Sequence, residues 1–337
     1  MLRRNKWKIA TAFVVLLASA YFYPAAAVTP LHFPNGKKFA FTIVDDTDMA
    51  TLERVRPLYA ILEKYGLRTT KTVWMFDSNN TSNNANRGDS LRNPDYRAFI
   101  EELHHKGFEI ALHGVRGGDS LRQETLDGLE EFKSVFGAYP QMQVNHSTNR
   151  DNLYWGPRLY STAPIRLAAR AAIRLPFDGD DPESPYFWGD AAKQHIKFVR
   201  RFTFSEINLY SVVPSMPYHL DEKPYVNYWF PTANGDRIRE FSELLKTENI
   251  ERLEREGGVC IVFAHLGSGS FNLQGGPVPD PRFEARIKEL ASHDGWFVPA
   301  SEILEFLMKQ PSWTGGIGYS EMVKLDAKFI AQQFGLN

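Results

Sequence analysis

The stretch Lys38-Phe39-Ala40-Phe41-Thr42-Ile43-Val44-Asp45-Asp46 joins an apolar run to two adjacent aspartates, and Asp48 follows two positions later. A run of this length, rich in β-branched and aromatic residues, predicts a strand that is buried on both faces. Because Thr47 and Asp48 favour a turn and a helical pattern begins at Glu53, we expect the carboxylates to lie where the strand ends. Alternatively, Asp46 or Asp48 only caps the following helix.

Strand-like and helix-like stretches alternate along most of the chain, with short connections between them. Further strands are predicted over 68–76, 108–113, 141–145, 258–265 and 296–298, and helices up to residue 65 and over 95–106, 121–136, 236–255, 281–292 and 301–309. The stretch 150–235, rich in aromatic residues, Pro, Gly and Asp, has no clear pattern. About seven such units without an internal repeat favour a parallel β/α barrel over residues 31–310.

Two terminal segments stand apart from this pattern. An uncharged apolar run over residues 9–28 follows four cations and ends at the small residues 25–27. We therefore expect residues 1–30 to be a signal peptide or an uncleaved membrane anchor, so that the protein is exported to the periplasm or another extracytoplasmic site. Membrane contact is expected only through this segment. Residues 311–337 are expected to form a tail whose short helix, over 322–334, packs on the barrel.

Composition excludes several classes of function. The chain has 337 residues and a formal net charge of −1, and its dispersed charges lack the basic stripe that nucleic acids require. Cys260 is the only cysteine, which excludes an internal disulfide and a zinc site built from several thiolates.

Polar residues follow several of the predicted strands. The pair Asp45 and Asp46 ends the first, His113 the third, His146 the fourth, and His265 the strand over 258–265. An aspartate with two histidines is a common ligand set for a catalytic divalent ion, zinc above all. Asp45 is a candidate base for water on that ion, and His265 a candidate acid for the departing group.

These residues resemble the polysaccharide deacetylase family, metal-dependent esterases that remove N- or O-acetyl groups from chitin, peptidoglycan and related polymers. The resemblance covers roughly residues 38–308 and includes the closing segment 296–304. It implies a distorted (β/α)7-type barrel, with Asp45 as the base, Asp46 and His113 as metal ligands, and His265 as a catalytic residue.

Two features depart from the family pattern. The family's second metal histidine lies four residues after the first, where this chain has Gly117. The Arg-Pro motif after the fourth strand is replaced by Val144-Asn145-His146-Ser147. We infer that His146 supplies the missing ligand. The loss of two motifs also fits a catalytically inactive carbohydrate-binding barrel.

Weaker candidates complete the expected site. Asp48 and Arg116 lie near the proposed ligands in the sequence, and Trp155 offers a ring for stacking against a sugar, so we expect these three to bind substrate. A glycoside hydrolase that uses Asp45 and Asp48 as its carboxylate pair is an alternative. The sequence favours a metal-dependent hydrolase that removes an N- or O-acyl group from a cell-envelope carbohydrate.

Overall fold

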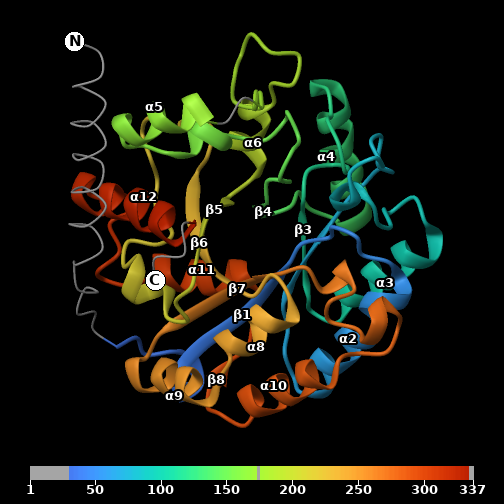
Figure 1. The fold of residues 1–337 in the computed structure, drawn as a ribbon, viewed down its shortest axis with the longest axis vertical. Helices are drawn as coiled ribbons and strands as arrows, with labels where there is room; N and C mark the ends of the chain where they lie inside the picture. The colour runs from blue at the N-terminus through green and yellow to red at the C-terminus, as the bar shows by residue number, and fades with distance from the viewer. Residues whose placement is uncertain (1–29, 173–174, 334–337) are drawn as a thin grey trace.

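The computed structural model describes residues 30–172 and 175–333 (Figure 1). The expected signal peptide or anchor, residues 1–30, lies almost wholly outside the described residues. Within the two described ranges, no helix combines the length and the apolar character needed to cross a bilayer.

Strand β1, Phe39–Asp45, is the centre of the fold and is buried along its whole length. It pairs in parallel with β7, Val259–Ala264, and at its carboxyl end with β2, Thr70–Val73. Seven parallel strands close into a ring through these two pairings, and the others are β3 Glu109–Leu112, β4 Met142–Gln143, β5 Phe198–Phe204 and β6 Tyr228–Asn234. The short β8, Gly295–Trp296, pairs with the start of β1. The predicted β/α barrel is therefore confirmed.

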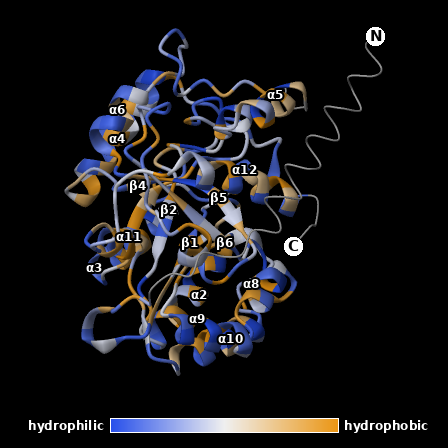
Figure 2. Cartoon of the chain, turned by 90° about the vertical axis from the view of Figure 1, so that its left-hand side faces the viewer, coloured by the Kyte–Doolittle hydropathy of each residue, from blue (hydrophilic) through white to orange (hydrophobic). Residues whose placement is uncertain are grey.

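Helices surround the ring and carry both hydrophobic and hydrophilic residues (Figure 2). Apolar side chains on their inner faces pack against the strands, as for α3, which buries Phe99, Ile100 and Leu103. The helices are α2 Leu52–Lys64, α3 Pro94–His105, α4 Arg122–Phe136, α5 Ala163–Ala172, α6 Gly189–His195, α7 Leu209–Val212, α8 Ile238–Leu244, α9 Thr247–Glu256, α10 Pro281–Ala291, α11 Ala300–Met308 and α12 Tyr319–Gln333. Short 3-10 helices are η1 Pro34–Gly36, η2 Asn84–Asn86, η3 Gly156–Leu159, η4 Leu266–Ser268 and η5 Leu273–Gly275.

Two parts of the barrel differ from the sequence-based expectation. The single helix predicted over 236–255 is wrong, because Lys246 is extended and separates α8 from α9. The stretch 150–235 supplies β5 and β6, to which the sequence analysis assigned no definite strands. Arg200 and Arg201 interrupt the apolar pattern of β5, and each is buried there because it pairs with a buried carboxylate, of Asp46 and Asp326 respectively.

The C-terminal helix α12 packs against the barrel, where a short tail helix was expected. Its Phe329 stacks on Phe202 of β5 with ring centroids 4.6 Å apart. Its Asp326 is fully buried and accepts the backbone N–H groups of Ser161 and Thr162, just before α5. The tail is thereby fixed to β5 and to the start of α5.

Candidate metal centre

The carboxylate of Asp48 faces three histidines. Its Oδ1 atom lies 2.8 Å from Nε2 of His146, and its Oδ2 atom lies 2.6 Å from Nε2 of His265 and 3.3 Å from Nε2 of His113. The histidines follow β4, β7 and β3, whose carboxyl ends meet at one face of the barrel. The ligand atoms of Asp48, His113 and His146 all lie within 4.8 Å of one another, and Asp46, Asp48 and His265 form a second such group.

The turn after β1 sets the direction of Asp48. The Thr47 N–H donates to Thr72 Oγ1 of β2 at 3.0 Å, and Met49 has a left-handed backbone with φ of 57°. The Leu52 N–H at the start of α2 donates to Asp89 Oδ2 at 2.8 Å. Asp89 therefore accepts a hydrogen bond from the start of α2, the helix end that Asp46 or Asp48 would cap in the alternative interpretation. Asp48 instead faces the histidines.

Hydrogen bonds fix the orientation of His146. Asn149 Nδ2 donates to the carbonyl of Arg116, so Asn149 Oδ1 is the acceptor for the Gly118 N–H and for His146 Nδ1, both at 3.0 Å. The proton on Nδ1 leaves Nε2 directed at Asp48 Oδ1 and, at 3.3 Å, at the carbonyl of Ala85. A partner of this kind orients a histidine for metal binding.

An unsatisfied buried atom supports a cation at this place. Among the described residues, Asp48 Oδ1 is one of the buried side-chain atoms that lack a hydrogen-bond partner. Asp48 Oδ1, His146 Nε2 and the Ala85 carbonyl are acceptors that converge once His146 carries its proton on Nδ1. One carboxylate with two imidazoles is a donor set that suits zinc and other borderline divalent ions, so these residues fit the expected metal.

Gly117 has no room for a side chain. A Cβ atom there would lie 2.7 Å from the carbonyl oxygen of Asn86 and 2.9 Å from the Trp74 ring. The Trp74 ring also packs against His146, with centroids 5.7 Å apart. The space beside Gly117 is thus filled by Asn86 and by Trp74, whose ring packs on His146.

Asp46 lies at the edge of this group. Both of its oxygens accept hydrogen bonds from the guanidinium of Arg200, at 2.9 and 2.6 Å. Its Oδ2 atom is 3.9 Å from Nε2 of His265. Asp46 is therefore a buried carboxylate that Arg200 holds in a fixed orientation next to His265.

Asp45 points to a different environment. Its Oδ2 atom lies 2.8 Å from Lys71 Nζ and accepts from the Tyr59 hydroxyl, and its Oδ1 atom accepts from the Leu266 N–H. Burial raises the pKa of Asp45, and the charge of Lys71 opposes this shift. Among the described residues, Asp46 and Asp48 belong to the groups of possible metal ligands that include the histidines. Asp45 belongs to neither group.

His265 is held between two carboxylates. Its Nδ1 atom is 2.5 Å from Asp236 Oδ1, and its Nε2 atom is 2.6 Å from Asp48 Oδ2. Burial by itself would lower the pKa of His265, but the hydrogen bonds to Asp236 and Asp48 and the charge of Asp46 raise it to about 10. The imidazole is accordingly charged at neutral pH.

Arg116 and Trp155 make contacts outside this group. Arg116 forms an ion pair with Glu124 at 3.0 Å, and its guanidinium lies over the Phe76 ring. Trp155 is partly buried and donates from Nε1 to the carbonyl of Ser147 at 3.2 Å. Substrate binding by either residue stays a prediction.

Sequence reasoning missed several residues of the site. Asp236 comes shortly after β6, as Asp46 comes directly after β1, but no strand was predicted there, so its place near a strand end could not be recognised. Arg200 carried a signal of its own, since an arginine in the middle of the apolar stretch 198–204 needs a buried partner. Asn149 gave no signal before the fold was known.

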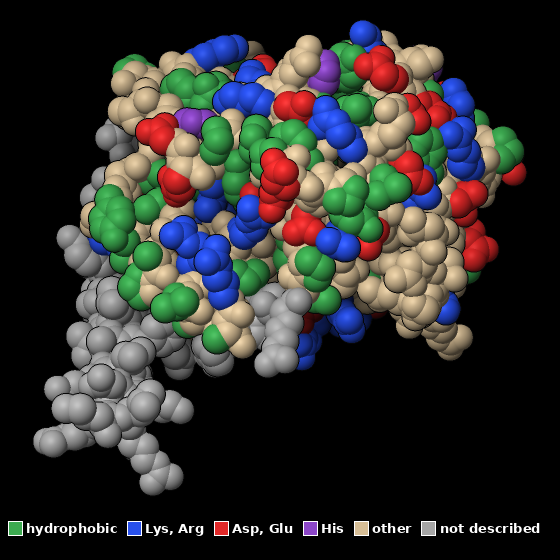
Figure 3. Space-filling model, turned by 90° about the horizontal axis from the view of Figure 1, so that it is seen from above, with side chains coloured by type: hydrophobic (Ala, Val, Ile, Leu, Met, Phe, Trp, Pro, Cys, Tyr) green, Lys and Arg blue, Asp and Glu red, His purple; other side chains and the backbone are tan. Residues whose placement is uncertain are grey.

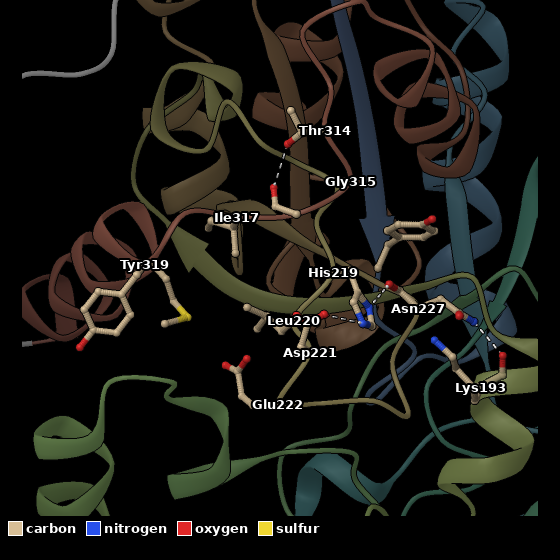
Figure 4. Close-up of a pocket in the computed structure, with 13 residues that line it drawn as sticks. Lys193, His219, Leu220, Asp221, Glu222, Asn227, Thr314, Gly315, Ile317 and Tyr319 are labelled. Atoms are coloured by element: carbon tan, nitrogen blue, oxygen red, sulfur yellow. Dashed lines mark hydrogen bonds and ion pairs between the residues drawn. The ribbon is translucent and has the colours of Figure 1, made fainter.

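A separate cavity of about 600 Å³ lies at the amino-terminal ends of β5 and β6 (Figure 4). His219 lines it and lies 2.9 Å, through Nδ1, from the carbonyl of Asn227. None of the residues predicted for the site lines this cavity. His219 is therefore a suitable control position for experiments on the histidines around Asp48.

Comparison with known proteins places the fold. No family model and no curated protein matches the sequence. A candidate polysaccharide deacetylase from Mycobacterium smegmatis superposes with a TM-score of 0.50 at 16% identity, over 87% of this chain and 98% of that one. An allantoinase superposes with a TM-score of 0.51 at 13% identity, over 87% and 99% of the two chains. The expected barrel of the polysaccharide deacetylase kind is thus confirmed, and the two neighbours differ in activity.

Proposed function

We propose that this protein is a metal-dependent hydrolase that removes an N- or O-acyl group from a cell-envelope carbohydrate, as a divergent relative of the polysaccharide deacetylases. The observation that carries the proposal is the convergence of Asp48, His113 and His146 from three strand ends. Asp46 and His265 stand beside them with their own charged partners, Arg200 and Asp236.

Asp48, His113 and His146 would hold the divalent ion, with zinc as the first candidate. When bound, such an ion lowers the pKa of a water ligand to about 7 and polarises an acyl carbonyl. Asn149 keeps the proton of His146 on Nδ1, so that Nε2 has its lone pair available. In this proposal Asp48 takes the role that the family resemblance implied for Asp46.

Asp46 and His265 would carry the proton transfers. Arg200 holds the carboxylate of Asp46 in a fixed orientation, in which it would accept a proton from the attacking water. His265 is held by Asp236, in an orientation in which it would donate a proton to the departing nitrogen or oxygen. Asp45, enclosed by Lys71 and Tyr59, would position the strand end rather than act on the substrate.

The alternatives make different demands on the same residues. A glycoside hydrolase would need Asp45 and Asp48 to face one glycosidic bond, whereas Asp45 faces Lys71 and Asp48 faces the histidines. A catalytically inactive carbohydrate-binding barrel would need no metal. Metal content and product chemistry therefore separate the three functions.

The test is metal analysis combined with product analysis. The protein is purified without chelators, beside Asp48→Asn, His146→Ala and the control His219→Ala. We expect stoichiometric metal in the parent and the control and its loss in the two site variants. The metal-loaded parent should release acetate from acetylated chitin or peptidoglycan fragments without creating new reducing ends. Negligible metal in all four proteins would favour the inactive binding barrel.

Export is a further part of the proposal. It rests on the sequence of residues 1–30, in which four cations precede the apolar run. An export segment suits a substrate in the cell envelope. Fractionation of cells that produce the full chain should recover it outside the cytoplasm, and an Arg3→Glu, Arg4→Glu, Lys6→Glu, Lys8→Glu variant should stay inside.

A further inference from the structure

The loop between β2 and α3 covers the candidate metal centre. We call residues 77–89 the covering loop, and it includes η2. The ligands beneath it are closed off from solvent, since the side chain of His146 is fully buried and those of His113 and Asp48 are 2% and 7% exposed. An acyl group carried on a polymer could not reach these ligands while the covering loop stays in place.

Hydrogen bonds hold the covering loop on two sides of the centre. On one side, Ser78 Oγ donates to the Gly117 carbonyl at 2.7 Å, in the segment after β3. On the other side, the Met49 N–H donates to the Arg87 carbonyl at 2.5 Å, in the turn that carries Asp48. The covering loop thus bridges two of the segments that supply ligands, and in Figure 1 it lies on the right, near α4.

The carbonyl oxygen of Ala85 points at the ligand atom of His146. It lies 3.3 Å from Nε2, and the same nitrogen lies 2.8 Å from Asp48 Oδ1. Because Asn149 keeps the proton of His146 on Nδ1, Nε2 has a lone pair and no N–H group to offer. Three acceptor atoms therefore converge without a donor between them, and a cation is the group that satisfies such an arrangement.

The separation of these atoms suits coordination of one ion. Two ligands at about 2.0–2.1 Å from a tetrahedral ion lie about 3.3 Å from each other. The Ala85 oxygen and His146 Nε2 have this separation, and so do Asp48 Oδ2 and His113 Nε2. Backbone carbonyls are ordinary oxygen ligands of divalent ions. We propose that the carbonyl of Ala85 is a fourth protein ligand of the ion, so that metal binding fixes the covering loop over the centre.

This inference rests on the metal centre of the proposed function and adds a closed state to it. Four protein ligands are typical of a closed zinc site, whereas a catalytic site keeps one position open for water or substrate. With Ala85 in place, no such position is left. The covering loop therefore has to move away, and the Ala85 carbonyl with it, before an acyl group can bind.

The composition of the covering loop suits this movement. Ala85 is its only hydrophobic residue, so opening the loop exposes very little apolar surface and breaks mainly hydrogen bonds that water can replace. Its exposed residues include Asn79, Asn80, Thr81, Ser82 and Asn84. From above, a broad area of uncharged polar side chains and backbone occupies the right-hand side of the molecule, where the covering loop lies (Figure 3).

The first experiment times the loss of zinc from the loaded full chain to an excess of a chromophoric chelator. Asn86→Ala removes the hydrogen bond from Asn86 Nδ2 to the Asn80 carbonyl, 2.9 Å long, which closes the covering loop on itself. We expect this variant to release zinc about fivefold faster than the parent, as for the loss of one hydrogen bond. The matched control is Asn84→Ala, an exposed residue of the same η2, which should release zinc at the parent rate. Equal rates in all three proteins would overturn the proposal.

The second experiment measures whether zinc fixes the covering loop. Zinc should slow the hydrogen exchange of the amides over 77–89 in the parent by about fivefold or more. Exchange over 312–318, beside the cavity at the other end of the barrel, should not change. Unchanged exchange over 77–89 in a protein that holds zinc would overturn this inference alone. A parent that holds no zinc would overturn the proposed function together with it.

Discussion

Oδ2 of Asp48 lies 2.6 Å from Nε2 of His265, and the same oxygen lies 3.3 Å from Nε2 of His113. One carboxylate thus connects the ligand group with the residue assigned to proton donation. Asp236 holds the other nitrogen of His265. The two carboxylates that flank His265 stabilise its charged form in the folded protein. The protonation of His265 should therefore change the free energy of unfolding with pH.

The metal-free protein should lose stability as the pH rises. The pKa of His265 is raised from 6.5 to about 10 in the folded chain, by Asp236 and Asp48 against the effect of burial. A raised pKa stabilises the folded state fully below about 6.5, and this contribution disappears as the pH passes about 10. Urea unfolding of chelator-treated protein across this range should show the decline, and His265→Gln should flatten it. A decline of the same size in His265→Gln would assign it to other groups.

Asn149→Leu should weaken metal binding without removing a ligand. The substitution deletes the acceptor that keeps the proton of His146 on Nδ1, and loss of such a partner typically costs 10- to 100-fold in metal affinity. Competition with a chromophoric chelator measures the dissociation constant. The exposed Asn80→Leu serves as the control, and an unchanged affinity in Asn149→Leu would exclude the assigned role of Asn149.

Gly117→His should not restore the histidine of the family pattern. Its Cβ would lie 2.7 Å from the Asn86 carbonyl oxygen, and overpacking of this kind costs about 1–3 kcal/mol or more. We expect a lower melting temperature and weaker metal binding. Gly316→Ala, at a glycine with open space around its position, should change neither. Tighter metal binding in Gly117→His would show that the loop can move and that a histidine at position 117 can be accommodated.

Asp45 and Asp46 should respond differently to substitution by Asn. Asp46→Asn removes the carboxylate beside His265 and should lower kcat by about 100-fold or more. Asp45→Asn changes a residue that contacts Lys71 and the Leu266 N–H, so its main effect should be on stability. Kinetics of the metal-loaded variants and their urea unfolding check both statements. A larger loss of kcat in Asp45→Asn would return the role of base to Asp45.

Lys71→Met should destabilise the barrel strongly. Lys71 and Asp45 are both fully buried, and removal of one partner of a buried ion pair costs about 3–5 kcal/mol because the remaining charge has no counterion. Replacing both residues in the double variant Asp45→Leu, Lys71→Met should recover much of the loss. Urea unfolding of Lys71→Met, of Asp45→Leu and of the double variant gives the coupling free energy, and additive effects would show that the two residues do not act as a pair.

The sequence alone predicted the barrel and the face that carries the polar residues. The apolar segment of β1, the alternation of strand-like and helix-like stretches and the histidines after strands are local patterns, and parallel strand ends necessarily meet at one face. His113, His146 and His265 could be selected on this basis, and the structure brings all three to Asp48. Local patterns failed for β5, because Arg200 is acceptable in a buried strand only once its distant partner Asp46 is known.

The tertiary structure decided which of three aspartates faces the histidines. Asp45 and Asp46 are neighbours at a strand end and must point in different directions, so the sequence could not assign one of them to the ligand group. Asp48 reaches that group because the turn after β1 is held by Thr72 on β2 and takes a left-handed residue at Met49. Such a turn depends on contacts between neighbouring strands. These contacts exist only once the ring of strands has closed, so no local sequence pattern predicts them.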